Sequence, residues 1–83
     1  MLDFSSQITA LRTRLADTQD YLRIADLRHR QPQLETELGR PDLWDDAAAA
    51  QILQREFSEM SDDLQLFDSL QSRVEDLAIL HEL

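Results

Sequence analysis

The sequence predicts an all-α fold, namely an antiparallel helical hairpin or small three-helix bundle with two long arms and a short linking helix. Three observations lead to this prediction. The 83 residues include only one glycine and two prolines, while helix-forming leucine, alanine, glutamine, glutamate and arginine are abundant. Apolar residues recur at helical spacing along two long segments. Between these segments, residues 39–44 concentrate glycine, proline and tryptophan, which indicates a joint between the arms.

The first helix is expected over about residues 5–27. One stripe of its surface steps by three and four residues along Ile8, Leu11, Leu15, Thr18, Leu22 and Ala25. Tyr21, Ile24 and Leu27 widen this stripe at its C-terminal end. Asp3 and the serines that follow it are suitable caps for the first turn. A helix of this length would extend for about 35 Å.

The second helix is expected to be short, over about residues 31–39. Leu34 and Leu38 lie four residues apart and define its apolar face. Pro32 is tolerated in a first helical turn, where a missing N–H costs little, so the predicted start lies near Gln31. The alternative is one long helix that runs through this region and is kinked at Pro32.

The joint after the second helix consists of Gly39, Pro41, Asp42, Leu43 and Trp44. Its glycine allows a positive φ and can end a helix. Its proline prevents further helix and favours an extended residue before it. The tryptophan is expected to be the apolar anchor of this corner, and Asp45 or Asp46 suits the N-cap of the next helix.

The third helix is expected over about residues 46–80. Its apolar stripe first follows Ala50, Leu53, Phe57, Met60, Leu64 and Phe67, and then Leu70, Val74, Leu77 and His81. Two successive steps of three meet at Phe67, which predicts a slip of the stripe that overwinds the helix or marks a change of partner. A break of the helix near residues 71–76 is the alternative.

The charge of the chain is acidic and uneven. The net charge is −9, with +1 on residues 1–30, −4 on residues 31–54 and −6 on residues 55–83. Phosphate would be repelled by the acidic half, so we expect no direct nucleic-acid contact there. A basic protein partner is compatible with this charge, and an acidic mimic or inhibitor is a further hypothesis.

The residues offer no self-contained catalytic or cofactor site. His29 and His81 lack the carboxylate or cysteine neighbours of a zinc site. Adjacent acids such as Asp62 and Asp63 point about 100° apart on a helix and do not form a converging acid–base pair. The chain has no cysteine, no glycine-rich phosphate loop, no secretory signal pattern and no apolar run of spanning length. We therefore expect a cytoplasmic interaction or structural domain that is not an enzyme, without metal or cofactor.

Three segments resemble a known family, the first being the opening stretch with Leu15, Tyr21 and Leu22. The run from Leu34 to Asp46, LETELGRPDLWDD, is followed by Ala50-Gln51 at the start of a helix, and the chain ends VEDLAILHEL over residues 74–83. Together they are similar to the N-terminal region of bacterial class I peptide chain release factors, most closely the release factor 2 type. Family members share a short helix, a Pro-Asp-aromatic turn and an Ala-Gln-rich helix start. Pro32 departs from the family pattern.

The resemblance implies a role in translation termination. It implies that residues 1–83 are a single N-terminal helical domain that docks the factor on the ribosome, in the stalk-base region, for termination at UGA and UAA. The Gly-Gly-Gln motif and codon-reading tripeptide of the family do not occur in this sequence, so no catalytic residue carries over. The alternative function is a free-standing helical adaptor or coiled-coil dimerisation module, since a core this small favours self-association.

Overall fold

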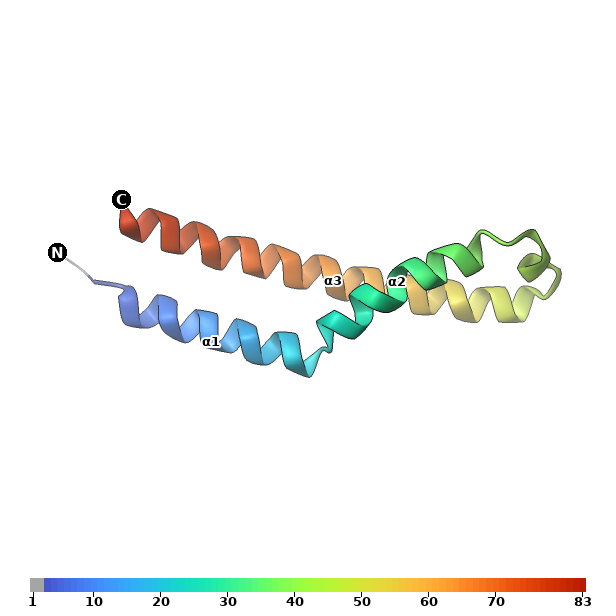
Figure 1. Cartoon of the computed structure of the whole chain (residues 1–83), viewed down its shortest axis with the longest axis horizontal. Coiled ribbons are helices and arrows are strands. Elements are labelled where there is room, and N and C mark those ends of the chain that lie inside the picture. The colour runs from blue at the N-terminus through green and yellow to red at the C-terminus, as the bar shows by residue number, and fades with distance from the viewer. Residues whose placement is uncertain (1–2) are drawn as a thin grey trace.

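The computed structural model describes residues 3–83 as an elongated helical hairpin (Figure 1). Its elements are α1 (Ser5–Tyr21), α2 (Ile24–Leu38), the 3-10 helix η1 (Pro41–Asp45) and α3 (Ala47–Glu82). Helices α1 and α2 follow one another along α3, which runs in the opposite direction, so the start of α1 and the end of α3 lie at the same end of the molecule. The molecule measures 64 × 22 × 16 Å. The predicted all-α helical hairpin is confirmed.

Helix α3 is continuous over 36 residues and forms one whole arm of the hairpin, against which the other helices pack. Its N-terminus is capped by Asp46, whose Oδ1 accepts a hydrogen bond of 3.2 Å from the backbone N–H of Ala49. Such a cap satisfies one of the N–H groups that have no partner within the helix. The predicted cap is confirmed, and the alternative break near residues 71–76 does not occur.

The core lies between α2 and the middle of α3. Its buried side chains are Ile24, Leu34, Met60, Leu64 and Phe67, and five half-buried apolar residues pack against them. Ile8, Val74 and Ala78 are buried nearer the termini, where α1 faces the C-terminal half of α3. The described residues include no buried polar or charged side chain. The hairpin therefore owes its stability to one apolar seam along α3.

The predicted first helix is wrong at its C-terminal end, because the chain breaks at Leu22–Arg23. Arg23 adopts a left-handed conformation, with φ 54° and ψ 49°. Two apolar stripes of different helical register meet there; one ends at Leu22 and the other begins at Ile24. A step of two residues turns a continuous helix by about 200°, so Leu22 and Ile24 could not both face α3. The break rotates α2 relative to α1, so that the apolar stripes of both helices face α3.

The predicted start of the second helix near Gln31 is also wrong. Helix α2 begins at Ile24 and includes Pro32 in its interior. The proline lies on the exposed side, while Ile24 and Leu34 are fully buried on the other side. Burial of that face keeps the segment helical although proline lacks the N–H that would bond to the carbonyl of Arg28. The alternative of a helix through Pro32 is correct for this segment, but it does not extend back through residue 23.

The predicted slip in the stripe of α3 does not occur. The buried stripe continues from Phe67 through Val74 and Ala78, with Gln71 at the intervening position. These positions keep the alternating steps of four and three that the earlier part of the stripe shows. Leu70 and Leu77, which we expected in the core, lie off this stripe and are exposed.

Candidate interaction surface

The joint forms the closed end of the hairpin, opposite the termini (Figure 1). Gly39 ends α2, as expected, with φ −81°, so the positive φ that a glycine allows is not used here. A Cβ added there would meet carbonyl oxygens at 3.5 and 3.6 Å, which is ordinary contact. Arg40 is extended, as expected before a proline, and Pro41 begins η1. The turn is thus set by the proline and does not require the conformational freedom of glycine.

Trp44 is less buried than its expected anchoring role requires. Half of its surface is exposed (50%), while its indole Nε1–H donates a hydrogen bond of 3.1 Å to the carbonyl oxygen of Leu38. Leu43 is the more buried member of the pair, and it lines a hollow of about 150 Å³ together with Leu53 of α3. The tryptophan fastens the end of α2 through its ring nitrogen, and the leucine supplies the apolar contact.

Substitution of Trp44 separates the contribution of its hydrogen bond to stability from the contribution of its half-buried ring. Trp44→Phe removes the hydrogen bond and one ring of the indole but keeps an aromatic side chain, and it is expected to lower the free energy of unfolding by about 1 kcal/mol. Trp44→Ala also removes the half-buried ring and is expected to cost about 2 kcal/mol. Urea unfolding followed by circular dichroism measures both. A loss above about 3 kcal/mol for Trp44→Ala would show instead a fully buried ring.

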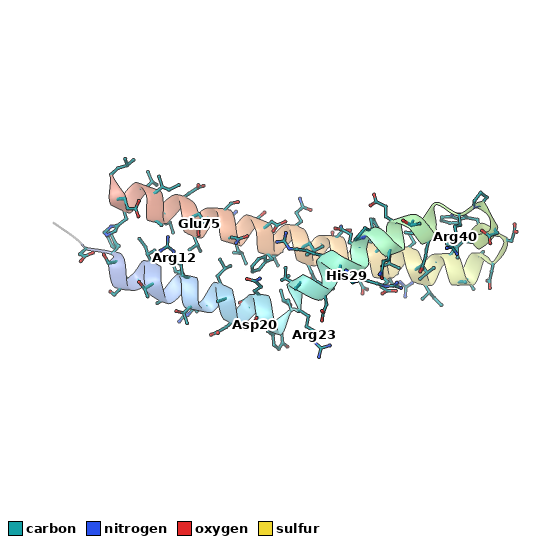
Figure 2. All side chains as sticks on the ribbon, in the orientation of Figure 1. Arg12, Asp20, Arg23, His29, Arg40 and Glu75 are labelled. Carbon is teal, nitrogen blue, oxygen red and sulfur yellow. The ribbon has the colours of Figure 1, made fainter. Side chains whose placement is uncertain are left out.

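Asp42, the remaining joint residue, is exposed in the first turn of η1. It lines the same hollow as Leu43, together with Arg40 and Glu37. The side chain of Arg40 is at this end of the molecule (Figure 2). The closed end therefore presents an exposed tryptophan edge, one arginine and several carboxylates, a surface suited to a polar partner.

Surface ion pairs connect the three α-helices. Arg28 on α2 pairs with Asp68 on α3 at 2.6 Å, and Arg30 pairs with Glu37 and Glu56 at 3.7 and 3.6 Å. Arg12 on α1 and Glu75 on α3 are 3.9 Å apart (Figure 2). The charged groups of these pairs are exposed or, for Arg30 and Glu37, half-buried, and such surface pairs contribute about 0–1 kcal/mol each. These pairs engage three of the few positively charged side chains, so the remaining surface is strongly acidic.

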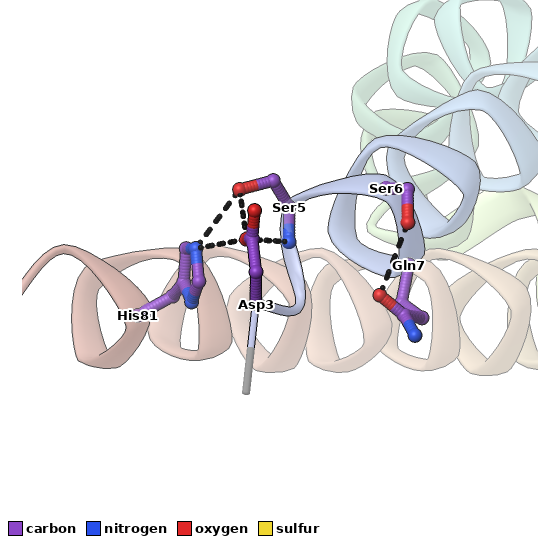
Figure 3. Close-up of polar contacts among 5 residues, drawn as sticks. All are labelled: Asp3, Ser5, Ser6, Gln7 and His81. Carbon is purple, nitrogen blue, oxygen red and sulfur yellow. Dashed lines mark hydrogen bonds and ion pairs between the residues drawn. The ribbon is translucent and has the colours of Figure 1, made fainter. Parts of the chain in front are cut away.

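A polar cluster connects the two chain ends (Figure 3). Asp3 Oδ1 accepts hydrogen bonds from the hydroxyl and backbone N–H of Ser5, at 2.6 and 2.9 Å, and lies 3.3 Å from Nε2 of His81. The Ser5 hydroxyl is 3.0 Å from the same nitrogen. Donation by the Ser5 hydroxyl, and then by its N–H, lowers the pKa of the Asp3 carboxyl below its ordinary value. The N-cap position of α1 is Phe4, which makes no side-chain cap hydrogen bond, so the prediction that Asp3 or one of the serines caps the helix is wrong; Asp3 accepts from the N–H of Ser5, the first residue of α1.

The other sequence candidates are not brought together. His29 is exposed on α2, near the middle of the molecule (Figure 2), and lies away from the cluster around His81. Within residues 3–83, no group of three or more histidine and carboxylate side chains is placed to hold a metal ion. None of the helices in this described part combines the length and apolar character of a membrane span.

Sequence reasoning missed an apolar surface near the termini. A groove of about 460 Å³ between α1 and α3 is lined by apolar Phe4, Ile8, Leu11, Leu77 and Leu80 together with polar Gln7 and His81. We call this the open-end groove. Leu77 had been expected in the core. The signal that could have found it is the regular heptad of the core stripe, which leaves Leu70 and Leu77 on a second stripe.

Comparisons with known proteins agree with the resemblance given by the joint. The chain is 35% identical to peptide chain release factor 2 of Arthrobacter sp. (strain FB24) over 82 residues, which is 99% of this chain. It is 38% identical to the release factor 2 proteins of Mycolicibacterium gilvum and Pseudarthrobacter chlorophenolicus, over 98% and 99% of its length. No protein-family profile and no solved structure matches.

The similarity covers nearly all of this chain but only a small part of its relatives. Nearly the whole chain is matched, but it spans only 22% of the length of these relatives. The predicted resemblance is confirmed: this helical hairpin is similar to bacterial peptide chain release factor 2 over nearly its whole length, and it spans about one-fifth of those proteins.

Proposed function

We propose that residues 1–83 form the N-terminal helical domain of a cytoplasmic release factor, and that this domain docks the factor on the ribosome near the stalk base. The factor would act at UGA and UAA stop codons. The observation that supports this function is the similarity to release factor 2 along 98–99% of the chain. In this proposal the domain contributes position and carries no chemistry.

The shape of the domain supports a positioning role. A rod of 64 Å with a continuous 36-residue helix can hold two contact surfaces far apart at fixed separation. One is the polar closed end around Trp44, and the other is the open end near Leu77. Because the acidic surface repels phosphate, we propose that the closed end contacts ribosomal protein and that Arg40 helps to orient it.

A chimeric factor tests this function. Residues 1–83 would replace the matched segment of the Arthrobacter release factor 2, and peptide release would be measured on ribosomes programmed with UGA. We expect the chimera to retain the maximal rate. A factor lacking the segment should need at least about tenfold more protein for half-maximal release, because docking contacts act through binding.

Two controls make this result specific. Ribosomes programmed with a sense codon should show no release with either protein. The chimera carrying Phe67→Ala, which removes a core side chain, should behave like the factor without the segment. If the intact chimera were no better than the deleted factor, the docking function would be wrong.

A further inference from the structure

Helix α1 is held against α3 by much less buried apolar surface than α2. Ile8 is its only buried side chain, whereas Ile24 and Leu34 of the shorter helix α2 are fully buried. Ile8 also lines two hollows, the open-end groove of about 460 Å³ and a second one of about 260 Å³, so even this contact is incompletely packed. Helices in proteins depend on such packing, because a separate short helix has little stability in water. Helix α1 is therefore the least stabilised of the three α-helices.

The polar links between α1 and α3 are few and exposed. Arg12 and Glu75 lie 3.9 Å apart with both side chains more than half exposed, so solvent screens the pair. At the open end, the cluster of Asp3, Ser5 and His81 connects the start of α1 to the last turn of α3. Within residues 3–83 no other side-chain hydrogen bond or ion pair joins these two helices. The links therefore add little to the burial of one isoleucine.

The joint between α1 and α2, at Leu22 and Arg23, has the properties of a hinge. Arg23 is held at φ 54°, a conformation that residues with a Cβ disfavour. Its N–H bonds back to the carbonyl of Asp20, and the next N–H to be bonded, that of Leu27, reaches only to the carbonyl of Arg23. No backbone hydrogen bond from α2 thus crosses this residue to α1. Helix α1 can leave α3 without unwinding α2, and its departure releases the strain at Arg23.

We propose that α1 is a hinged arm, which detaches from α3 as one unit about residues 22–23 while α2, η1 and α3 remain folded. The buried core cluster consists of side chains from α2 and α3, so it is retained in the open form. Opening exposes Val74 and Ala78, which are buried where α1 lies along the C-terminal half of α3 (Figure 1). The domain then has a closed and an open form, both with the same length of α3. This property is independent of the docking function and is tested without ribosomes.

Thiol labelling of engineered cysteines tests the opening, because the natural chain has no cysteine. Ala50 and Ala78 are both buried alanines near the ends of α3, but Ala50 lies at the closed end, away from α1. We expect Ala78→Cys to react with a maleimide at least about tenfold faster than Ala50→Cys. Far-UV circular dichroism verifies that both variants are folded. Equal reaction rates would overturn the proposal.

A third cysteine distinguishes detachment of α1 from fraying of the C-terminus of α3. Val74 is buried one turn further from that end than Ala78. If α1 detaches as a unit, Val74→Cys and Ala78→Cys should react at rates within about threefold of each other. Fraying would instead leave Val74→Cys as slow as Ala50→Cys, and this result would contradict the hinged arm.

Hydrogen exchange followed by mass spectrometry tests the arm in the unmodified chain. We expect the amides of residues 9–21 to exchange at least about tenfold faster than those of α2 and of residues 60–67. Ile8→Ala should accelerate exchange in residues 9–21 by at least about tenfold more, with α2 unchanged. Leu34→Ala is the control, because it removes a fully buried core side chain and should accelerate exchange in α2 and α3 as well. If Ile8→Ala accelerated exchange equally in all three helices, α1 would not open separately and the proposal would be wrong.

Discussion

Replacement of Phe67 by alanine is expected to lower the free energy of unfolding by about 3–5 kcal/mol. Phe67 is the largest fully buried side chain, with 1% of its surface exposed, and it belongs to the cluster that joins α2 to α3. Its loss would leave a cavity that Ile24 and Leu34 cannot fill without moving both helices. Thermal and urea unfolding, followed by circular dichroism at 222 nm, measure the change.

The size of this effect matters because the domain is small. The single core of a domain of about 80 residues supplies roughly 3–5 kcal/mol of net stability. The Phe67→Ala chain should therefore be largely unfolded at room temperature. Ile52→Ala is the matched control on the same helix, because Ile52 is 69% exposed and should change stability by at most about 0.5 kcal/mol. A Phe67→Ala chain that unfolds like the control would show that the α2–α3 seam is not the core.

Replacement of Pro32 by alanine is expected to raise the free energy of unfolding by about 1–2 kcal/mol. An interior proline costs a helix about 3 kcal/mol, and proline recovers part of this by restricting the unfolded chain. Pro32 is exposed in the interior of α2, so alanine restores the N–H without disturbing the core. The midpoint of urea unfolding should therefore rise.

The second proline provides the control for this result. Pro41 begins η1, where its fixed φ is compatible with the turn, so Pro41→Ala should leave stability unchanged or lower it by up to about 1 kcal/mol. The two substitutions thus have opposite expected signs. If Pro32→Ala were destabilising, α2 would begin near Gln31, as the sequence alone predicts.

Much of the fold follows from local rules that the sequence displays. The long α3 helix and its cap at Asp46 agree with propensity, stripe and capping chemistry. The extended Arg40 and the turn at Pro41 follow from proline sterics. These features depend on residues close in the chain, so a reading of local chemistry finds them.

The failures share a different cause, which is the competition between faces for one partner helix. The break at Arg23 has no glycine or proline to mark it, and it forms because Leu22 and Ile24 both reach α3. Pro32 stays inside a helix because the opposite face is buried. Leu77 is exposed because Ala78 occupies the seam with α1. Each outcome depends on contacts between distant residues.

The candidate surfaces divide in the same way. The joint around Trp44 was identified from its residues, and its resemblance to release factors was confirmed over nearly the whole chain. The half-exposed position of the tryptophan ring was not predictable, because it depends on how α2 and α3 approach each other at that end. The open-end groove was likewise not predictable from the expected stripe.

By itself, the sequence determined the helical class, the corner at residues 39–46 and the resemblance of this chain to release factors, because these rest on propensity, backbone sterics and residue identity. Only the tertiary structure decided where α1 ends, which leucines are buried and which face stays open. The physical reason is that several apolar stripes compete for the single surface of α3. Burial is then assigned by three-dimensional packing, which helical periodicity alone leaves undetermined.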